Sequence, residues 1–206
     1  MLGQQASFPA VDESDLDLDP LAALGAWLDE ARSAVGDADV MTLATATPDG
    51  HPSARVVLVR GVGPAGVDFF TNRLSRKGRE LAANPRAALV LHWWKLGRQV
   101  RVEGDVEALG DEDSEAYWRT RPRASQLAAW ASPQSRPLPG RKALDARVRG
   151  ESVRFAGSEV PLPPFWGGYR VVPHALEFWT HREDRLHDRI RYDRAGSRWR
   201  RERLFP

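Results

Sequence analysis

The spacing of apolar residues changes along the chain from a helical repeat to a strand-like repeat. Asp19 and Pro20 suit the N-cap and the first position of a helix, apolar residues then recur every three or four positions, and Gly36 can end the helix. From Val40 onward apolar and polar residues alternate, which is typical of half-buried strands. The alternation predicts strands over residues 40–46, 54–60, 67–71, 87–94, 99–108, 168–179 and 189–204, the last one folded at Ala195-Gly196.

Two shorter helices are expected between these strands. Residues 75–84 form a helical segment closed by Asn84-Pro85, and residues 111–121 begin with acidic side chains that favour a helix N-terminus. Residues 132–165 are rich in Pro, Gly and Arg, and the pattern leaves residues 136–160 open. Short strands with intervening helices predict an antiparallel, mostly β barrel with helical additions (α+β), not a doubly wound parallel sheet.

Composition limits the domain organisation and the compartment. Residues 1–18 are polar and acidic with little periodicity, so we expect a flexible acidic tail before a single domain over residues 19–206. The chain has 206 residues and no cysteine, which excludes disulfides and thiolate metal sites and fits a reducing cytoplasm. Neither a secretory signal nor an apolar run of about 18 residues is present, so we expect a cytoplasmic protein without a membrane span.

Charge is balanced overall but unevenly distributed. Residues 11–19 hold five acidic residues and no basic one, whereas residues 182–203 hold nine arginines. Because acidic side chains are interleaved with these arginines, a small phosphorylated molecule is a better partner for them than nucleic acid.

Two polar clusters on predicted helices are candidates for binding an anion. Ser75-Arg76-Lys77-Gly78 combines a hydroxyl and two cations with the free amides of a helix start, which together favour a phosphate. Tyr117 and Arg121 lie four residues apart and share a helix face, and Ser125 follows. A solvated first turn and a polar helix end are the alternatives that the residues alone leave open.

A third cluster follows Trp179 near the C-terminus. On a strand, Arg185, His187 and Arg189 would point to one face. A histidine between two arginines is expected to have a lowered pKa and to be neutral near pH 7. The chain shows no Ser-His-Asp pattern and no metal-ligand spacing of its five histidines, so we expect no metal.

Taken together, these clusters resemble the pyridoxamine/pyridoxine 5′-phosphate oxidase family. The matching stretches, in order, are Arg55–Arg60, Phe70-Thr71-Asn72, Ser75-Arg76-Lys77, Arg98-Gln99-Val100, Arg121–Gln126, Ala129–Ser135, Pro161-Leu162-Pro163, Phe165–Gly168 and Glu177–Arg189. Their order and approximate spacing are those of the family from about residue 20 to the C-terminus. The resemblance implies a split barrel that forms a homodimer, with FMN bound at the subunit interface.

The resemblance also implies roles for individual residues. By position, FMN is held by Arg55, Val56, Val57, Leu58, Arg60, Phe70, Thr71, Arg76, Lys77, Gln99, Gln134, Ser135, Trp179 and Arg189. The substrate is contacted by Arg60, Tyr117, Arg121, Ser125, Arg185 and His187, of which Arg185 and His187 are the catalytic pair. The implied reaction oxidises pyridoxamine or pyridoxine 5′-phosphate to pyridoxal 5′-phosphate and reduces O2 to H2O2, with the flavin supplying the redox chemistry.

Two positions depart from the family pattern. The motif at residues 55–60 usually ends in a lysine that contacts the substrate phosphate, and Arg60 changes the geometry of that contact. The family's basic N-terminal segment is replaced by the acidic Asp12-Glu13-Ser14-Asp15, a poor partner for phosphate. Two alternatives therefore stay open: an FMN oxidase of another planar anionic reduced ring, such as a dihydrophenazine carboxylate, and a barrel that binds flavin or another planar ligand without turnover.

Overall fold

The computed structural model describes residues 8–206, and in this range nine antiparallel strands form one curled sheet. The strands are β1 (Val40–Ala46), β2 (Pro52–Leu58), β3 (Gly61–Gly63), β4 (Gly66–Asn72), β5 (Arg86–Trp93), β6 (Arg98–Ala108), β7 (Trp166–Thr180), β8 (Asp188–Ala195) and β9 (Arg198–Arg203). The helices are α1 (Pro20–Ala34), α2 (Arg76–Ala83), α3 (Asp111–Thr120), α4 (Arg123–Ala131) and α5 (Arg141–Arg154), with short 3₁₀ segments η1 (Glu13–Asp15), η2 (Trp94–Leu96) and η3 (Glu183–Arg185).

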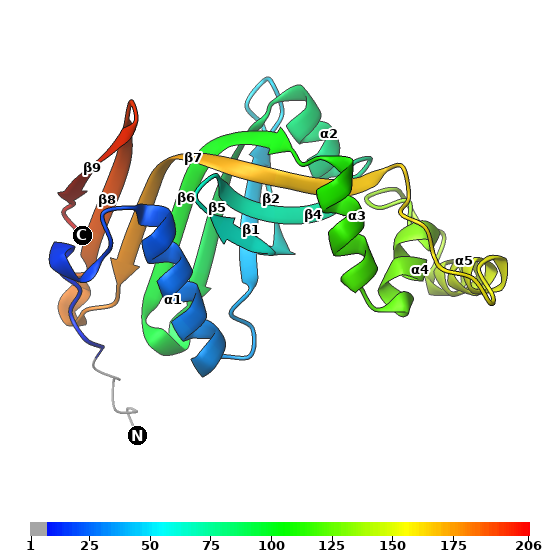
Figure 1. The fold of residues 1–206 in the computed structure, drawn as a ribbon, viewed down its shortest axis with the longest axis horizontal. Coiled ribbons are helices and arrows are strands. Elements are labelled where there is room, and N and C mark those ends of the chain that lie inside the picture. Colours follow the sequence, from blue (N-terminus) through cyan, green and yellow to red (C-terminus); the bar gives the residue numbers. More distant parts are fainter. Residues whose placement is uncertain (1–7) are drawn as a thin grey trace.

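Strand β7 links the two ends of the molecule (Figure 1). It has 15 residues and pairs with β6 along one edge. On its other edge it pairs first with β4 and then with β8. At about 3.3 Å per residue, β7 spans up to about 46 Å. Helices α3, α4 and α5 lie at its start, and the β8–β9 hairpin lies at its end (Figure 1).

A bulge lets β6 follow the curve of β7. The register between the two strands shifts between Glu103 and Gly104. A Cβ at residue 104 would overlap the backbone carbonyl of Val172, so this close approach requires glycine. Because a bulge bends and twists its strand, the sheet curls here, and β2 lies near β4 although the two are not hydrogen-bonded neighbours.

The main hydrophobic core lies between α1 and the sheet. Asp19 caps α1 by accepting a hydrogen bond from the Leu21 amide at 3.0 Å, and Pro20 occupies the first turn, as the sequence predicts. The ring of Trp27 meets the ring of Phe178 on β7 edge-on, with 5.1 Å between centroids. This face of α1 is therefore fixed against the end of β7.

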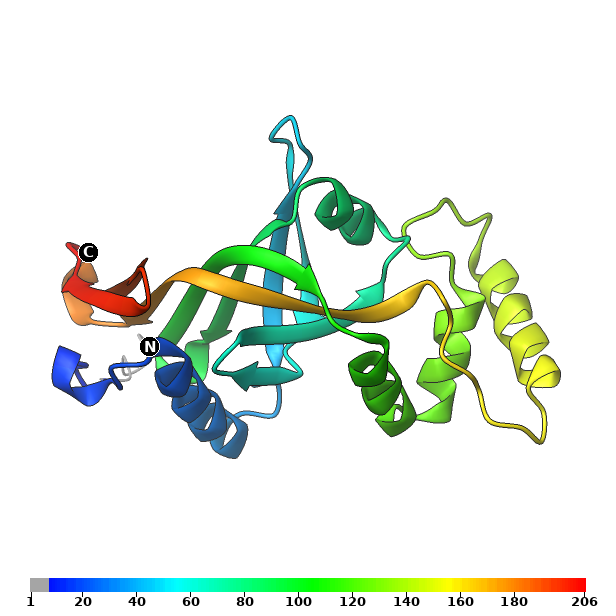
Figure 2. The same cartoon turned by 45° about the horizontal axis from the view of Figure 1, so that its top comes forward.

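A second apolar cluster lies at the start of β7. Its members are Trp118, Leu127, Phe155, Val160 and Trp166. The indole Nε1 of Trp118 donates to the carbonyl of Val160 at 2.8 Å, so this buried polar atom is satisfied. Helices α4 and α5 lie side by side at this end (Figure 2). The cluster holds the segment 155–165 against the beginning of β7.

Most elements agree with the sequence pattern, and the predicted fold class is confirmed. The strand expected over 54–60 lies at Pro52–Leu58, with the short β3 after it, and the closing hairpin turns at Gly196 as predicted. The pattern does not predict α4 or α5. Helix α5 buries no residue, so its sequence carries no apolar stripe to detect. Within residues 8–206, no helix is both long and apolar enough to cross a membrane.

The segment before α1 differs from the expected flexible tail. Residues 1–7 lie outside the described residues, but Val11 and Leu16 are buried in the main core. The hydroxyl of Tyr192 on β8 donates to the carbonyl of Asp17 at 2.8 Å. Two of the acidic side chains that suggested a solvated tail, Asp12 and Glu13, pair with Arg203 of the C-terminal hairpin, so their charges are compensated.

Two helical glycines are expected to respond oppositely to substitution by alanine. In Gly78→Ala, the new Cβ would overlap the backbone of Arg73, so unfolding free energy should fall by about 1–3 kcal/mol. In Gly150→Ala on α5 nothing lies within 4 Å, so stability should rise by up to about 1 kcal/mol through helix propensity. Urea unfolding of both variants measures the pair, and equal changes would contradict the close approach at residue 78.

Candidate active site

A cavity of about 340 Å³ opens between β2, β4, α2 and the junction of α3 with α4. It is lined by Val56, Val57, Leu58, Arg60, Phe70, Thr71, Lys77, Tyr117, Arg121, Pro122, Ser125 and Gln134. These residues include members of both predicted sets, those assigned to the flavin and those assigned to the substrate phosphate. The described sheet ends at β2, so one edge of this strand keeps backbone donors and acceptors unpaired for a ligand.

Lys77 places a buried cation at this cavity. Its ammonium contacts the Thr71 hydroxyl at 3.1 Å, the Ser75 hydroxyl at 3.3 Å and the Gln134 amide oxygen at 2.8 Å. Within residues 8–206 it pairs with no carboxylate. Burial, and then the charge of Arg55, lower the pKa of Lys77 to about 8. An anion bound here would recover the electrostatic stabilisation that Lys77 lacks in the free protein.

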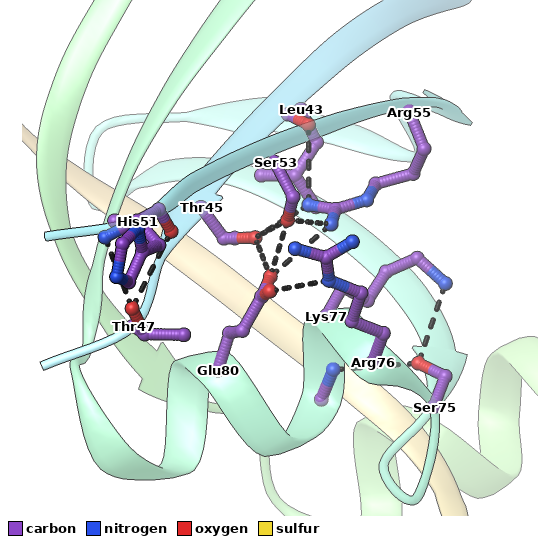
Figure 3. A network of polar contacts seen from close by, with 12 residues as sticks. Leu43, Thr45, Thr47, His51, Ser53, Arg55, Ser75, Arg76, Lys77 and Glu80 are labelled. Carbon is purple, nitrogen blue, oxygen red and sulfur yellow. Dashed lines mark hydrogen bonds and ion pairs between the residues drawn. The ribbon is translucent and has the colours of Figure 1, made fainter. Parts of the chain in front are cut away.

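A buried carboxylate behind the cavity organises two of the predicted flavin arginines (Figure 3). Glu80 accepts hydrogen bonds from Arg76 Nε at 2.8 Å and Arg55 Nη2 at 3.2 Å, and also from Thr45 and Ser53. Burial acts to raise the pKa of Glu80, but these hydrogen bonds outweigh it and hold the pKa at about 2. Arg55 and Arg76 therefore face Glu80 and do not line the cavity.

An aromatic stack contributes two of its rings to the lining of the cavity. The rings of Phe70 and Tyr117 stack with 4.2 Å between centroids, and Trp166 lies parallel to both. The guanidinium of Arg121 sits over the Trp166 ring at 4.8 Å, and that of Arg60 sits over Tyr117 at 5.6 Å. Arg121 and Arg60 are thus held on the same stack as cations facing the cavity.

Arg121 is the less satisfied of these two arginines. Its Nη2 donates to the Ser125 carbonyl at 3.2 Å, but its buried Nε has no hydrogen-bond partner in the described part of the chain. Burial lowers the pKa of Arg121, although an arginine remains charged. Arg60, in contrast, also pairs with Asp39 at 3.5 Å. The predicted trio Tyr117, Arg121 and Ser125 is therefore brought together on one wall.

The remaining predicted residues lie at the other end of β7. Gln99 on β6 is paired in register with Trp179 on β7, and Trp179 is paired with Arg189 on β8. Residues directly opposite one another on adjacent strands point to the same face, so these three form a row. Arg189 makes a bidentate contact with the buried carboxylate of Glu177, with hydrogen bonds of 2.9 and 3.1 Å.

The expected strand alternation of Arg185, His187 and Arg189 is wrong. Arg185 ends the 3₁₀ segment η3, and β8 begins only at Asp188. Asp184 and Arg185 have left-handed backbones, with φ of 57° and 63°, which no strand can contain. The Arg182 amide closes the turn by donating to Nδ1 of His187 at 3.1 Å.

His187 nevertheless has the lowered pKa that the sequence suggested. Burial is the largest cause, followed by the charges of His181 and then Arg185, while Asp188 opposes them. Arg189, the other arginine of the predicted cluster, is paired with Glu177. The His187 ring lies 4.6 Å from the Trp179 ring, centroid to centroid. This end of β7 therefore carries a histidine that favours its neutral form.

The cavity residues and the residues around His187 cannot form one site within a single chain. Trp166 belongs to the cavity's aromatic stack and Trp179 contacts His187, yet both lie on the same continuous strand. Their 13-residue separation corresponds to about 43 Å along an extended strand. Ser135, beside Gln134, is exposed with φ of 70° and lies in neither group.

Glu80 is the residue that sequence reasoning missed. Its separation of four residues from Arg76, on a helix predicted over 75–84, was the available signal for an ion pair. The pairing of Glu80 with Arg55 and Thr45 had no such signal, because these two residues lie on strands β2 and β1, far from α2 in the sequence.

Two family models together match most of this chain. A family model described as pyridoxamine 5′-phosphate oxidase matches residues 28–154. A second, described as the pyridoxine 5′-phosphate oxidase C-terminal dimerisation region, matches residues 166–206. The chain belongs to the pyridoxamine 5′-phosphate oxidase family. The predicted family is thereby confirmed, and the C-terminal dimerisation region supports the predicted homodimer.

Individual relatives cover nearly the whole chain. The pyridoxine/pyridoxamine 5′-phosphate oxidase of Rubrobacter xylanophilus is 53% identical over 195 residues, covering 94% of this chain and 90% of the relative. The protein of the same name from Cupriavidus taiwanensis is 52% identical over 199 residues, covering 96% and 93%.

Solved structures confirm the split-barrel fold of the family. PhzG from Burkholderia lata, in complex with tetrahydrophenazine-1-carboxylic acid, has a TM-score of 0.91 at 35% identity and covers 98% of this chain and 100% of its own. A pyridoxamine 5′-phosphate oxidase-related, FMN-binding protein from Nostoc punctiforme has a TM-score of 0.73 at 19% identity, covering 93% and 100%, and shows the fold alone.

The Glu80 carboxylate is expected to stabilise the protein in a pH-dependent way. Glu80→Gln should lower the unfolding free energy at pH 7 by about 3 kcal/mol, since Arg55 and Arg76 lose their shared counter-charge. Folding lowers the pKa from 4.5 to about 2, so this contribution is complete above pH 4.5 and is lost as the pH falls toward 2. Urea unfolding at pH 7 and pH 3 should show a smaller gap between the two proteins at pH 3.

The matched control is an exposed pair. Glu115→Gln removes the contact with Arg119 on α3 and should change stability by less than about 0.5 kcal/mol. An equal loss in Glu80→Gln at both pH values would contradict the assignment of its stabilising effect to the carboxylate charge.

Proposed function

We propose that this protein is an FMN-dependent oxidase that converts pyridoxamine or pyridoxine 5′-phosphate to pyridoxal 5′-phosphate, reducing O2 to H2O2. The carrying observation is the cavity in which Lys77 and Arg121 face a common space without a carboxylate partner in residues 8–206. Relatives that share about half of their residues with this chain over nearly its whole length are named for this activity.

The residues of the cavity fit FMN. Lys77, Thr71 and the Ser75 region would hold the phosphate, because a buried ammonium and hydroxyl donors favour an anion. The free edge of β2 at Val56–Leu58 would hydrogen-bond the polar rim of the flavin ring. Arg55 and Arg76 would contribute positive potential while Glu80 fixes their side chains. When bound, FMN supplies the two-electron acceptor and its reoxidation by O2.

Arg121, Tyr117 and Ser125 would bind the phosphate of the substrate. The guanidinium of Arg121 and the Tyr117 hydroxyl would be the donors on one wall of the cavity. Arg60, over the Tyr117 ring, adds a second cation from β2's end. An arginine at this position can bind a phosphate through two donors, so the departure from the family's usual lysine is compatible with a phosphorylated substrate.

The remaining site residues would come from the second copy of the chain. Gln99, Trp179 and Arg189 form a row about 43 Å along β7 from Trp166, which stacks on the cavity residues Phe70 and Tyr117, so one chain cannot supply both halves. A homodimer that places the end of one chain's β7 against the other's cavity would complete two equivalent sites. The matched C-terminal dimerisation region supports this assembly.

Arg185 and His187 would act at the reacting carbon. Nδ1 of His187 accepts the Arg182 amide, so the proton of the neutral ring lies on Nε2. Nε2 can hold the amine or hydroxyl of the substrate and take part in moving its proton. Arg185 would stabilise negative charge there, and its left-handed backbone is the kind of local strain found at functional sites.

FMN affinity is expected to depend on the charge of Lys77. In the free protein the pKa of Lys77 is about 8, below its usual 10.5, so its charged fraction falls as the pH rises through 8. FMN binding, followed by flavin fluorescence quenching, should therefore weaken between pH 7 and pH 9. Lys77→Met should weaken binding about 10- to 100-fold at pH 7 and abolish this slope. The exposed Lys142→Met on α5 is the control; a slope retained in Lys77→Met would contradict the role of Lys77.

Substrate class is tested by peroxide release. FMN-loaded protein should release H2O2 with pyridoxamine or pyridoxine 5′-phosphate. His187→Ala should lower kcat about 10²- to 10⁴-fold while FMN stays bound. His51→Ala, on the exposed β1–β2 turn, is the matched control and should be fully active.

The second candidate follows from the PhzG structure. Its TM-score of 0.91, with a reduced tricyclic carboxylic acid bound, favours a test of such rings in the same assay. Release of peroxide with a dihydrophenazine carboxylate but with neither vitamin B6 phosphate would transfer the assignment to that class.

A further inference from the structure

Asp188, the neighbour of His187, receives three contacts from different parts of the chain. Its carboxylate accepts from Arg203 Nη1 on β9 at 2.9 Å, and Arg182 Nε lies 3.7 Å away. The amide of Val11 reaches the same carboxylate at 3.4 Å. Asp188 therefore connects the N-terminal segment, the turn that carries His187 and the C-terminal strand β9.

Arg203 continues from Asp188 to the acidic N-terminal segment. Its Nη2 lies 2.6 Å from Asp12 and 2.9 Å from Glu13, and it also donates to the Val11 carbonyl at 3.4 Å. We call Asp12, Glu13, Asp188 and Arg203 the terminal latch. The hydrogen bond from Arg203 is the largest cause that lowers the pKa of Glu13 to about 2, so this carboxylate stays charged in the latch at neutral pH.

The residues that precede the terminal latch, from Phe8 onward, pack against the turn that carries His187. The carbonyl of Phe8 accepts from Arg182 Nη1 at 3.3 Å, and the Phe8 ring meets the His181 ring with 5.7 Å between centroids. At Gly97 a Cβ would overlap the Phe8 ring, so the ring is seated in a space that only glycine leaves open. His181 in turn lies 5.3 Å from His187, centroid to centroid. The chain from residue 8 to Glu13 is thus packed along the turn.

We propose that Arg203 is a positioning residue for His187: through Asp188, Asp12 and Glu13 it fixes the N-terminal segment against the turn that carries the imidazole. The proposal rests on the proposed function in taking His187 as the group that acts on the substrate. It assigns a use to the acidic N-terminal segment, whose charges are turned toward Arg203 and not toward a bound phosphate.

The turn contains backbone conformations that depend on contacts with its neighbours. Asp184 and Arg185 adopt left-handed backbones, which cost free energy and persist only when neighbouring contacts fix them. Arg182 supplies two of these contacts, one to Nδ1 of His187 and one to the Phe8 carbonyl. Exposed ion pairs contribute little to global stability individually, so the effect of the latch is local.

Arg203→Ala tests the proposal against Arg200→Ala. Arg200 lies on the same strand and, within residues 8–206, pairs only with Asp193 and Glu202, which are outside the latch. Three measurements are made on FMN-loaded protein: hydrogen exchange at the Val11 amide, the NMR titration of His187, and kcat and KM with pyridoxamine 5′-phosphate. Arg203→Lys tests rescue by a conserved charge, and the double variant Asp12→Asn, Glu13→Gln opens the latch from its other side.

In Arg203→Ala, exchange at Val11 should accelerate at least about tenfold because the segment opens locally. The pKa of His187 should rise, since Asp188 loses a neutralising partner while His181 and Arg185, the other charges that face the ring, stay in place. The value of kcat should fall about tenfold through misplacement of the ring, with FMN retained. The double variant should open the segment in the same way, Arg203→Lys should recover most of the loss, and Arg200→Ala should match the wild type.

Unchanged exchange at Val11 and an unchanged His187 titration in Arg203→Ala would overturn the proposal. So would a loss of kcat in Arg200→Ala equal to that in Arg203→Ala, since the effect would then belong to the hairpin and not to the latch. If exchange and titration change as expected but His187→Ala is fully active, the positioning by Arg203 stands and the catalytic role proposed for His187 fails.

Discussion

The structure depends on the continuity of β7. A strand of 15 residues that is hydrogen-bonded on both edges cannot bend back on itself, so residues at its two ends remain far apart. The side chains that the proposed function uses lie near one end of β7 or the other. The cavity with Lys77 and Arg121 lies near its start, and Trp179 with His187 lies near its finish. Dimerisation is therefore part of the construction of the site in the proposed function.

The cations in the cavity and beside it fall into two electrostatic classes. Arg55 and Arg76 share the buried carboxylate of Glu80, so their positions are fixed before any ligand arrives. Lys77 is buried and Arg121 is half-buried without such a partner in the described residues, and this costs folding free energy. In the proposed function, a bound dianionic phosphate would offset that cost. In the proposed function, the fixed arginines add positive potential from outside the cavity lining, while the uncompensated cations that line the cavity give it affinity for anions.

Much of the fold and part of the cavity were predictable from the sequence because they depend on local spacing of residues. The periodicity located α1, α2, α3 and most strands, and the spacing of Tyr117, Arg121 and Ser125 predicted a shared wall. Helix α5 was not predictable, since it buries no residue and shows no apolar stripe. The turn before β8 was misread as a strand because Asp184 and Arg185 adopt left-handed backbones, which alternation of polar residues does not reveal.

Long-range charge pairing is the part that the sequence concealed. The acidic residues before α1 and the arginines of the C-terminal hairpin are each typical of a solvated segment when considered alone. Arg203 joins them across about 190 positions of the chain, a contact for which no local spacing exists. The same reason hid the role of Glu80, whose partners Arg55 and Thr45 come from strands distant in sequence.

The separation of the two half-sites along β7 has a consequence for inheritance and for mixtures of chains. When each site takes one end from each of two copies, a chain defective at its cavity and a chain defective at His187 can complement one another. Their heterodimer contains one site with both defects and one site with neither. Two individually inactive alleles expressed in one cell would then restore part of the activity, with random pairing giving about a quarter of the normal number of sites.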